Sequence, residues 1–162
     1  MLDKTISNCD LDLDYVIPAI DITEEELRAI IYDAESIISE NKVDSKKLAI
    51  AYLKKAQCLQ KIEANIDNFD ETQCQIKRII EKAMELSPNM PEAVMQMGKY
   101  SALCEHEKAI ADFSDVVFLR PDMIKAFLLR GLAYLSIGDK NKAKEDFDEY
   151  LRRKNKVYTK HI

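Results

Sequence analysis

Glycine and proline are scarce in this sequence and tryptophan is absent: the 162 residues include 3 Gly, 4 Pro and no Trp. Multistranded β-sandwiches and barrels need many turns, and those turns use Gly and Pro repeatedly. The shortage therefore favours long helices. So few glycines also exclude a glycine-rich phosphate loop or a paired-glycine dinucleotide fingerprint, the marks of many nucleotide-binding enzymes.

Long apolar runs are missing as well. Residues 1–20 contain several Asp and no continuous apolar segment, and no run elsewhere approaches transmembrane length. We therefore expect neither a secretory signal nor a membrane span. The four cysteines, Cys9, Cys58, Cys74 and Cys104, show no CxxC pair and no metal-ligand spacing. A reducing, cytoplasmic setting is the expectation.

The net charge of −5 argues against nucleic-acid binding, but the charge is uneven along the chain. Residues 1–14 carry a net charge of −3, and residues 152–162 carry +5. We interpret the basic end as a solvated helix terminus whose cations complement the helix dipole, with a basic docking tail as the alternative.

Apolar residues recur every three or four positions through most of the chain, which predicts helices. Thr23 followed by Glu26 forms a capping box for the first helix. Residues 65–71 are expected to form a polar loop anchored by Phe69. The predicted helices cover residues 23–41, 45–64, 72–86, 91–103, 107–119, 123–137 and 140–154.

A repeat organises the second half of the chain. Matched residues lie 33 or 34 positions apart: Pro88 and Pro121, Ala93 and Ala126, Gly98 and Gly131, Ala109 and Ala143, Phe113 and Phe147. A fixed period in this range indicates stacked helical hairpins. The small residues allow the two helices of a hairpin to approach closely, and the phenylalanines supply bulk that locks each hairpin to its neighbour.

These are the roles of the signature positions in tetratricopeptide repeats (TPR), and residues 48–155 resemble that family. The match is strongest over residues 122–155; residues 48–88 match less well, with eight residues inserted around 65–71. The resemblance implies an all-α, right-handed superhelical array of antiparallel helix hairpins: three repeats (48–88, 89–121, 122–155) plus an N-terminal helix. Residues 1–22 are expected to form an acidic extended arm, 23–155 the helical domain and 156–162 a basic tail.

The resemblance further implies that the first helix of each hairpin lines a concave, ligand-binding groove. Leu128, Leu132 and Leu135 follow the i, i+4, i+7 pattern of one apolar stripe, so we expect a peptide or amphipathic helix of another protein as the ligand. The alternative is that these leucines pack inside the array. The candidate groove residues are Met95, Gln96, Lys99, Leu103, Lys125, Leu128, Leu129, Leu132 and Leu135.

One TPR subtype grips the C-terminal carboxylate of chaperone tails with a two-carboxylate clamp. Of the clamp positions, only Lys125 carries the required residue; the others hold Leu53, Gln57, Gln96 and Leu129. A chaperone-tail-binding function is therefore the less favoured expectation.

The C-terminal end offers a second hypothesis. The last predicted helix has no polar capping helix after it, although such arrays normally need one for solubility. Tyr150, Leu151 and Tyr158 would then leave an apolar edge for homo-oligomerisation or assembly into a larger complex, unless residues 155–162 fold back over it. The sequence is compatible with both outcomes.

No pattern points to catalysis, a metal or a cofactor, so we expect a protein that is not an enzyme. Asp10, Asp12 and Asp14 are spaced like the start of a calcium loop, but Tyr15 stands where that loop needs glycine. His106 and His161 lack a ligand constellation, and His106 is interpreted as a turn residue.

Overall fold

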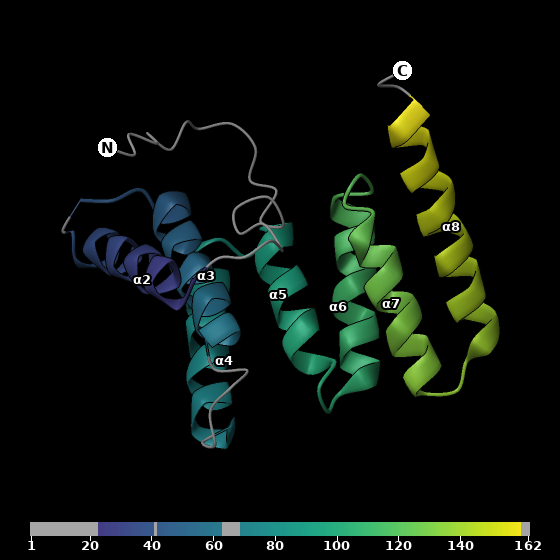
Figure 1. The fold of residues 1–162 in the computed structure, drawn as a ribbon, viewed down its shortest axis with the longest axis horizontal. Helices are drawn as coiled ribbons and strands as arrows, with labels where there is room; N and C mark the ends of the chain where they lie inside the picture. Colours follow the sequence, from purple (N-terminus) through teal and green to yellow (C-terminus); the bar gives the residue numbers. More distant parts are fainter. Residues whose placement is uncertain (1–22, 41, 63–68, 160–162) are drawn as a thin grey trace.

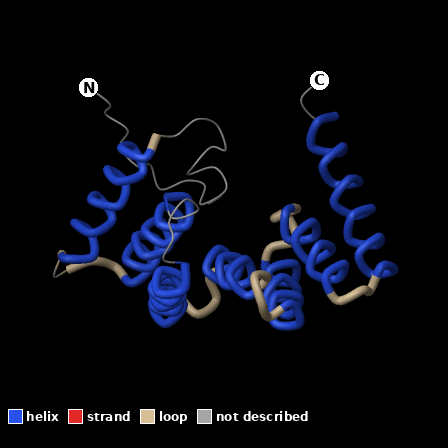
Figure 2. The backbone as a smooth tube through the Cα atoms, turned by 60° about the horizontal axis from the view of Figure 1, so that its bottom comes forward, coloured by secondary structure: helices blue, strands red, loops and turns tan. Residues whose placement is uncertain are grey.

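The computed structural model describes residues 23–40, 42–62 and 69–159. These residues form helices joined by turns, without a strand, which confirms the predicted all-α hairpin array (Figure 1). The helices are α2 (Glu24–Ser39), α3 (Ser45–Ile62), α4 (Phe69–Leu86), α5 (Pro91–Ser101), α6 (His106–Leu119), α7 (Lys125–Ser136) and α8 (Lys140–Thr159). They follow one another along an arc, with α2 at one end and α8 at the other (Figure 2).

The helix starts have local chemical causes. The Glu26 amide donates to Thr23 Oγ1 at 3.3 Å and the Thr23 amide donates to Glu26 Oε2 at 2.8 Å, so the predicted capping box is confirmed. Asp44 Oδ2 likewise accepts from the amides of Lys46 and Lys47 at the start of α3. These contacts satisfy amide groups that the first helical turn leaves without a partner.

Two boundaries differ from the sequence prediction by three residues or more. Helix α4 begins at Phe69, which we expected in the preceding loop, because the acidic residues that follow it favour a helix start. Helix α8 continues to Thr159 and includes part of the predicted basic tail, since no Gly or Pro interrupts residues 140–159. The predicted arm, residues 1–22, lies outside the described residues, as do residues 160–162.

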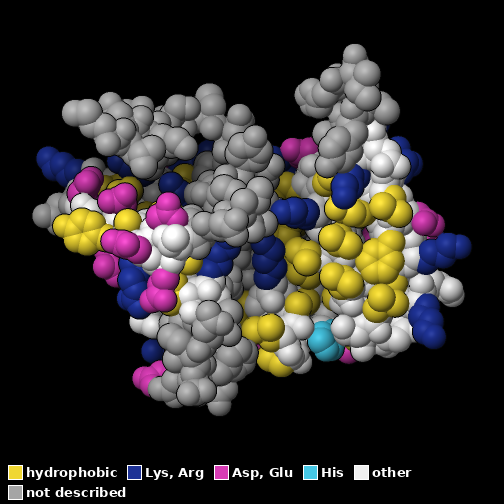
Figure 3. All heavy atoms as spheres, in the orientation of Figure 1, with side chains coloured by type: hydrophobic (Ala, Val, Ile, Leu, Met, Phe, Trp, Pro, Cys, Tyr) yellow, Lys and Arg dark blue, Asp and Glu magenta, His cyan; other side chains and the backbone are white. Residues whose placement is uncertain are grey.

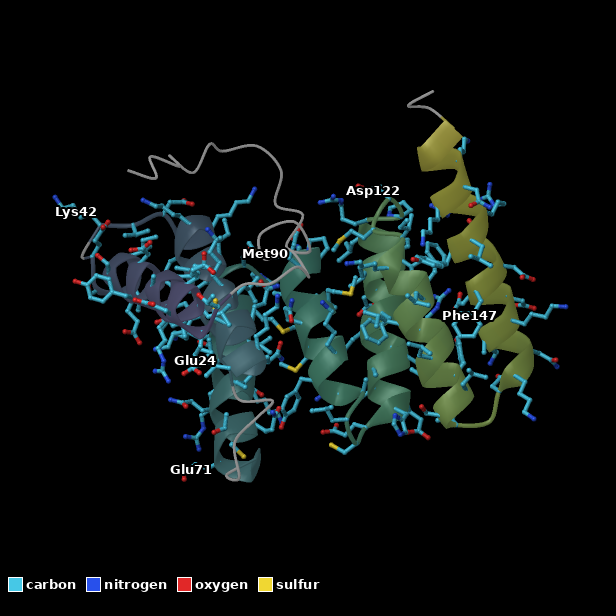
Figure 4. All side chains as sticks on the ribbon, in the orientation of Figure 1. Glu24, Lys42, Glu71, Met90, Asp122 and Phe147 are labelled. Atoms are coloured by element: carbon cyan, nitrogen blue, oxygen red, sulfur yellow. The ribbon has the colours of Figure 1, made fainter. Side chains whose placement is uncertain are left out.

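The two clear repeats share one packing device. A Cβ atom added to Gly98 would lie 2.6 Å from Cε1 of Phe113, and one added to Gly131 would lie 2.6 Å from Cε1 of Phe147. Each glycine therefore provides the space that the phenylalanine of the partner helix occupies (Figure 4 labels Phe147). The same contact at both places confirms that the sequence repeat is a structural repeat.

Apolar packing runs through the stack as two large clusters of buried residues. The first joins α3, α4 and α5 through Ala49, Leu53, Ala56, Ile76, Ile80, Ala83, Met90, Ala93 and Met97. The second joins α5, α6 and α7 through Val94, Met95, Ala109, Phe113, Val116, Met123, Ala126 and Ala133. Helix α5 contributes to both clusters and so connects the irregular half of the array with the regular half.

Helix α2 takes the place that the second helix of a preceding repeat would have. It packs on α3 through a cluster that includes Leu27 and Cys58. Ala51 and Cys58 are buried seven residues apart on α3, at positions equivalent to Ala126 and Ala133, which α7 buries against α6. Helix α2 therefore covers α3 as α6 covers α7. None of the described helices is both long and apolar enough to cross a membrane.

Candidate interaction surface

The candidate surface is carried by the first helices of the hairpins, α3, α5 and α7. The small residues Ala56, Gly98 and Gly131 occupy equivalent places on these helices, so positions counted from them can be compared. The position two before the small residue holds Lys54, Gln96 and Leu129 in the three helices. The position one after it holds Gln57, Lys99 and Leu132. We call these two rows, with Met95, Lys125, Leu128 and the nearby Leu103 and Leu135, the first-helix surface.

Its apolar part is open at one end of the array. Leu103, Leu132 and Leu135 are 56%, 48% and 44% exposed, while Leu128 is half-buried. We call these four residues the leucine surface. Large apolar side chains that stay this accessible are informative when they gather in one place. The alternative that Leu128, Leu132 and Leu135 all pack inside the array therefore does not hold for Leu132 and Leu135.

Two predicted groove residues lie inside the array. Met95 is 3% exposed and packs with Phe113 and Val116, and Gln96 is 2% exposed. Leu129 is half-buried and also packs on this cluster. The expectation that Met95 and Gln96 present an accessible surface needs correction, because both side chains are buried, Met95 within the cluster that joins α5, α6 and α7. Lys99 is half-buried and Lys125 is exposed.

Polarity changes along the surface from α3 to α7. One row runs from Lys54 through Gln96 to Leu129, and the other from Gln57 through Lys99 to Leu132. Figure 3 shows the result on one face: Lys and Arg side chains gather in the middle, and hydrophobic side chains gather toward the α7 and α8 end. A ligand that crosses the helices would meet polar, cationic groups first and leucines later.

Lys54 and Gln57 were not among the predicted site residues. Burial lowers the pKa of the Lys54 ammonium, with the neighbouring Cys58 and Asp33 acting in the opposite direction. The Gln57 side chain is 8% exposed, and its Oε1 atom has no hydrogen-bond partner among the described residues. An acceptor buried in this way costs stability unless a donor reaches it. Their equivalence to Gln96 and Lys99 was the sequence signal that would have identified them.

Contacts of two arginines stabilise the scaffold behind the leucine surface. Arg130 on α7 binds Asp146 on α8 through two N–H donors, at 2.8 and 2.7 Å, and donates a third hydrogen bond to Ser114 on α6. The Asp146 carboxylate raises the pKa of the Arg130 guanidinium further. At the other end of α7, Arg120 bridges Glu92 and Asp122. Arg130 therefore ties the leucine-bearing helix to both α6 and α8, and Arg120 ties the end of α6 to α5 and to the loop before α7.

The surface offers little for chemistry. The described residues contain no group of three His, Cys, Asp or Glu side chains placed to hold a metal ion. Cys58, Cys74 and Cys104 are free thiols, and burial raises the pKa of the Cys58 thiol to about 11. A buried thiol that stays protonated at neutral pH is a poor nucleophile.

Comparison with known proteins agrees with this geometry. Residues 124–156 match the family model described as tetratricopeptide repeat. No curated protein matches the sequence. The fold is similar to the crystal structure of the MamA protein, with 20% identity, a TM-score of 0.62 and coverage of 84% of this chain and 68% of that one.

A second similar structure is the second TPR of Spaghetti (RPAP3) bound to the HSP90 peptide SRMEEVD. It shares 20% identity and a TM-score of 0.56, covering 65% of this chain and 92% of that one. At this level of identity the likeness concerns the fold. Residues 124–156 therefore match a tetratricopeptide repeat, and the described helices together have a fold similar to the hairpin array of TPR proteins.

Proposed function

We propose that this protein is a non-enzymatic interaction module that binds an apolar segment of another protein, a peptide or one face of an amphipathic helix. The observation that carries the proposal is the leucine surface: Leu132 and Leu135 are exposed on one stripe of α7, and Leu103 after α5 is exposed as well. Burying such side chains contributes about 25 cal/mol for each Å² of apolar area removed from water. A partner segment would supply that burial.

The polar residues of the same surface would set the orientation of the ligand. Lys125 lies six residues before Gly131 on the leucine-bearing helix, and Lys99 lies beside Gly98 on the neighbouring helix. Cations at these places favour a ligand whose apolar residues are flanked by acidic ones. The less accessible residues of the surface would contribute indirectly, by fixing the shape of α5 and α7; these are Met95, Gln96 and Leu129.

The binding mode differs from a carboxylate clamp. Among the clamp positions, Leu53 is fully buried, Gln57 and Gln96 are neutral amides, and Leu129 is apolar; Lys125 alone matches. A chaperone tail would therefore leave its carboxylates without most of their cationic partners. We propose apolar burial as the main source of affinity instead. The free thiols are compatible with the cytoplasmic setting, which stays a prediction.

The test is capture of partners from the native cell, with cross-linking mass spectrometry to locate the bound surface. Leu128→Asp combined with Leu132→Asp is expected to abolish capture while far-ultraviolet circular dichroism keeps its helical signal, because both charges fall where a partner would remove water. Phe118→Asp combined with Leu151→Asp is the matched control, since both residues are exposed and outside the leucine surface. Capture that survives the leucine substitutions in a folded chain would show the proposal to be wrong.

A further inference from the structure

We propose that residues 10–17 of this chain occupy the first-helix surface of the same molecule and compete there with an external partner. The inference rests on the binding surface of the proposed function and names a ligand for it. Residues 10–17 are Asp-Leu-Asp-Leu-Asp-Tyr-Val-Ile, within the segment that precedes α2. Three properties of the described helices point to this segment: their charge, their leucines and a buried acceptor.

The charges are complementary. Lys54, Lys99 and Lys125 stand on α3, α5 and α7, one cation on each first helix. In the segment, Asp10, Asp12 and Asp14 supply three carboxylates at every second position. Residues 1–14 carry a net charge of −3, and the positive charge of the chain is concentrated in other segments. Opposite charges at short range favour one register of the segment over others.

The apolar residues fit as well. In an extended chain, side chains at successive positions point to opposite sides. Leu11, Leu13 and Tyr15 would then lie on the side opposite to the three aspartates. The first-helix surface also offers two kinds of partner, the lysines of its three helices and the leucine surface. Figure 3 shows Lys and Arg side chains and hydrophobic side chains in neighbouring areas of one face. A two-sided segment and a two-sided surface match when the acidic side meets the lysines and the apolar side meets the leucines.

The buried amide of Gln57 supplies an independent indication. Its Oε1 atom is enclosed without a hydrogen-bond donor among the described residues. Every residue of an extended segment except proline brings a backbone N–H, and those donors must find acceptors when the segment is covered. A segment laid across α3 would bring backbone donors to the helix that carries this acceptor.

The tether is long enough. Residues 10 and 14 precede Thr23 by 13 and 9 positions, which an extended chain spans in about 43 and about 30 Å. Helix α2 packs on α3, and α3 contacts α5. With neighbouring helix axes roughly 10 Å apart, the distance from α2 across α3 and α5 to α7 is about 30 Å. The segment is therefore long enough to reach each of the three lysines within one molecule.

Photo-cross-linking of the full chain tests the proposal without any external partner. Leu13→p-benzoylphenylalanine is expected to cross-link within one molecule to α5 and α7, and mass spectrometry identifies the acceptor peptides. The same group placed at exposed Tyr32 on α2 is the control, and it should not reach α5 or α7. Acceptor peptides scattered over the chain, or cross-links between two chains, would overturn the intramolecular contact.

Charge reversal separates a specific contact from chance proximity. Lys99→Glu combined with Lys125→Glu should lower the cross-linked fraction at limiting illumination by about ten-fold, the effect of one or two partly exposed ion pairs. Adding Asp10→Lys and Asp12→Lys to this variant should restore the cross-link, which a variant that merely failed to fold cannot do. A yield indifferent to both changes would overturn the charge pairing. Because no partner takes part, this result is independent of the capture test of the leucine surface.

Discussion

At the scale of single residues, two glycines make the same contact in different surroundings. Gly98 faces Phe113 and Gly131 faces Phe147, each with 2.6 Å between a hypothetical Cβ and the ring carbon Cε1. Phe113 is fully buried between α5, α6 and α7, whereas Phe147 on α8 is half-buried. The ring that must move to admit a methyl group is therefore enclosed in one hairpin and partly free in the other.

This difference predicts unequal costs for one substitution. Gly98→Ala is expected to destabilise the protein by about 1–3 kcal/mol, the usual cost of overpacking, less roughly 1 kcal/mol gained from the better helix propensity of alanine. Gly131→Ala is expected to cost less, because Phe147 is able to shift toward solvent. The free energy of unfolding in urea measures both. Adding Phe147→Leu to Gly131→Ala is the control and should recover any loss, and a larger cost at Gly131 than at Gly98 would contradict the packing argument.

At the scale of an element, α8 is tied to the start of α7 through charged groups near its end. Glu149 accepts hydrogen bonds from Arg152 and Arg153, and Arg153 also donates to the Pro121 carbonyl oxygen. The Arg153 guanidinium lies 4.7 Å from the ring centre of Phe127 on α7. Glu149 thereby holds an arginine that links the two helices. Its contacts with Arg152 and Arg153 lower its pKa from 4.5 to about 2.

The lowered pKa sets the pH range in which this link matters. A carboxyl with a lower pKa in the folded state stabilises the protein above its unfolded value and loses that contribution as protonation proceeds. Glu149→Gln should therefore lower the melting temperature at pH 7, with the difference from the unmodified chain shrinking as the pH falls from about 4.5 to about 2. Glu145→Gln, an exposed carboxyl on the same helix, is the control. A difference independent of pH would contradict an electrostatic role for Glu149.

At the scale of the whole molecule, the sequence period predicted the architecture because each repeat reuses one local contact. The spacing of Gly98 and Gly131 sufficed to place the hairpins, and the capping box placed the start of α2. Burial on the binding surface was harder to predict, since it depends on how many neighbours a helix has. Met95 and Leu128 are equivalent in the repeat, yet Met95 lies mid-array and is enclosed while Leu128 is partly accessible. Equivalent positions thus acquire different roles from their place in the stack.

The polarity of the last helix bears on self-assembly through the C-terminal end. Helix α6 packs toward α7 and the adjoining cluster with Ile110 and Val117. Thirty-four residues later, α8 has Lys144 in place of Ile110 and Leu151 in place of Val117. Leu151 is 52% exposed, and Lys144 is exposed as well. The outer side of α8 therefore carries a charge where α6 has an apolar contact, as a terminal cap does.

Among the side chains described on α8, Leu151 is the one large apolar residue that is exposed, and the side chain of Tyr158 lies outside that description. One such leucine falls far short of the roughly 1,000 Å² that a stable interface buries. We therefore expect a monomer whose mass by multi-angle light scattering does not change with concentration, and Leu151→Asp should leave that mass unchanged. A dimer abolished by Leu151→Asp would instead establish the C-terminal end as an assembly surface. A dimer abolished by Leu132→Asp but not by Leu151→Asp would show that the leucine surface pairs two copies, because the two residues lie on different helices and Leu132 alone belongs to that surface.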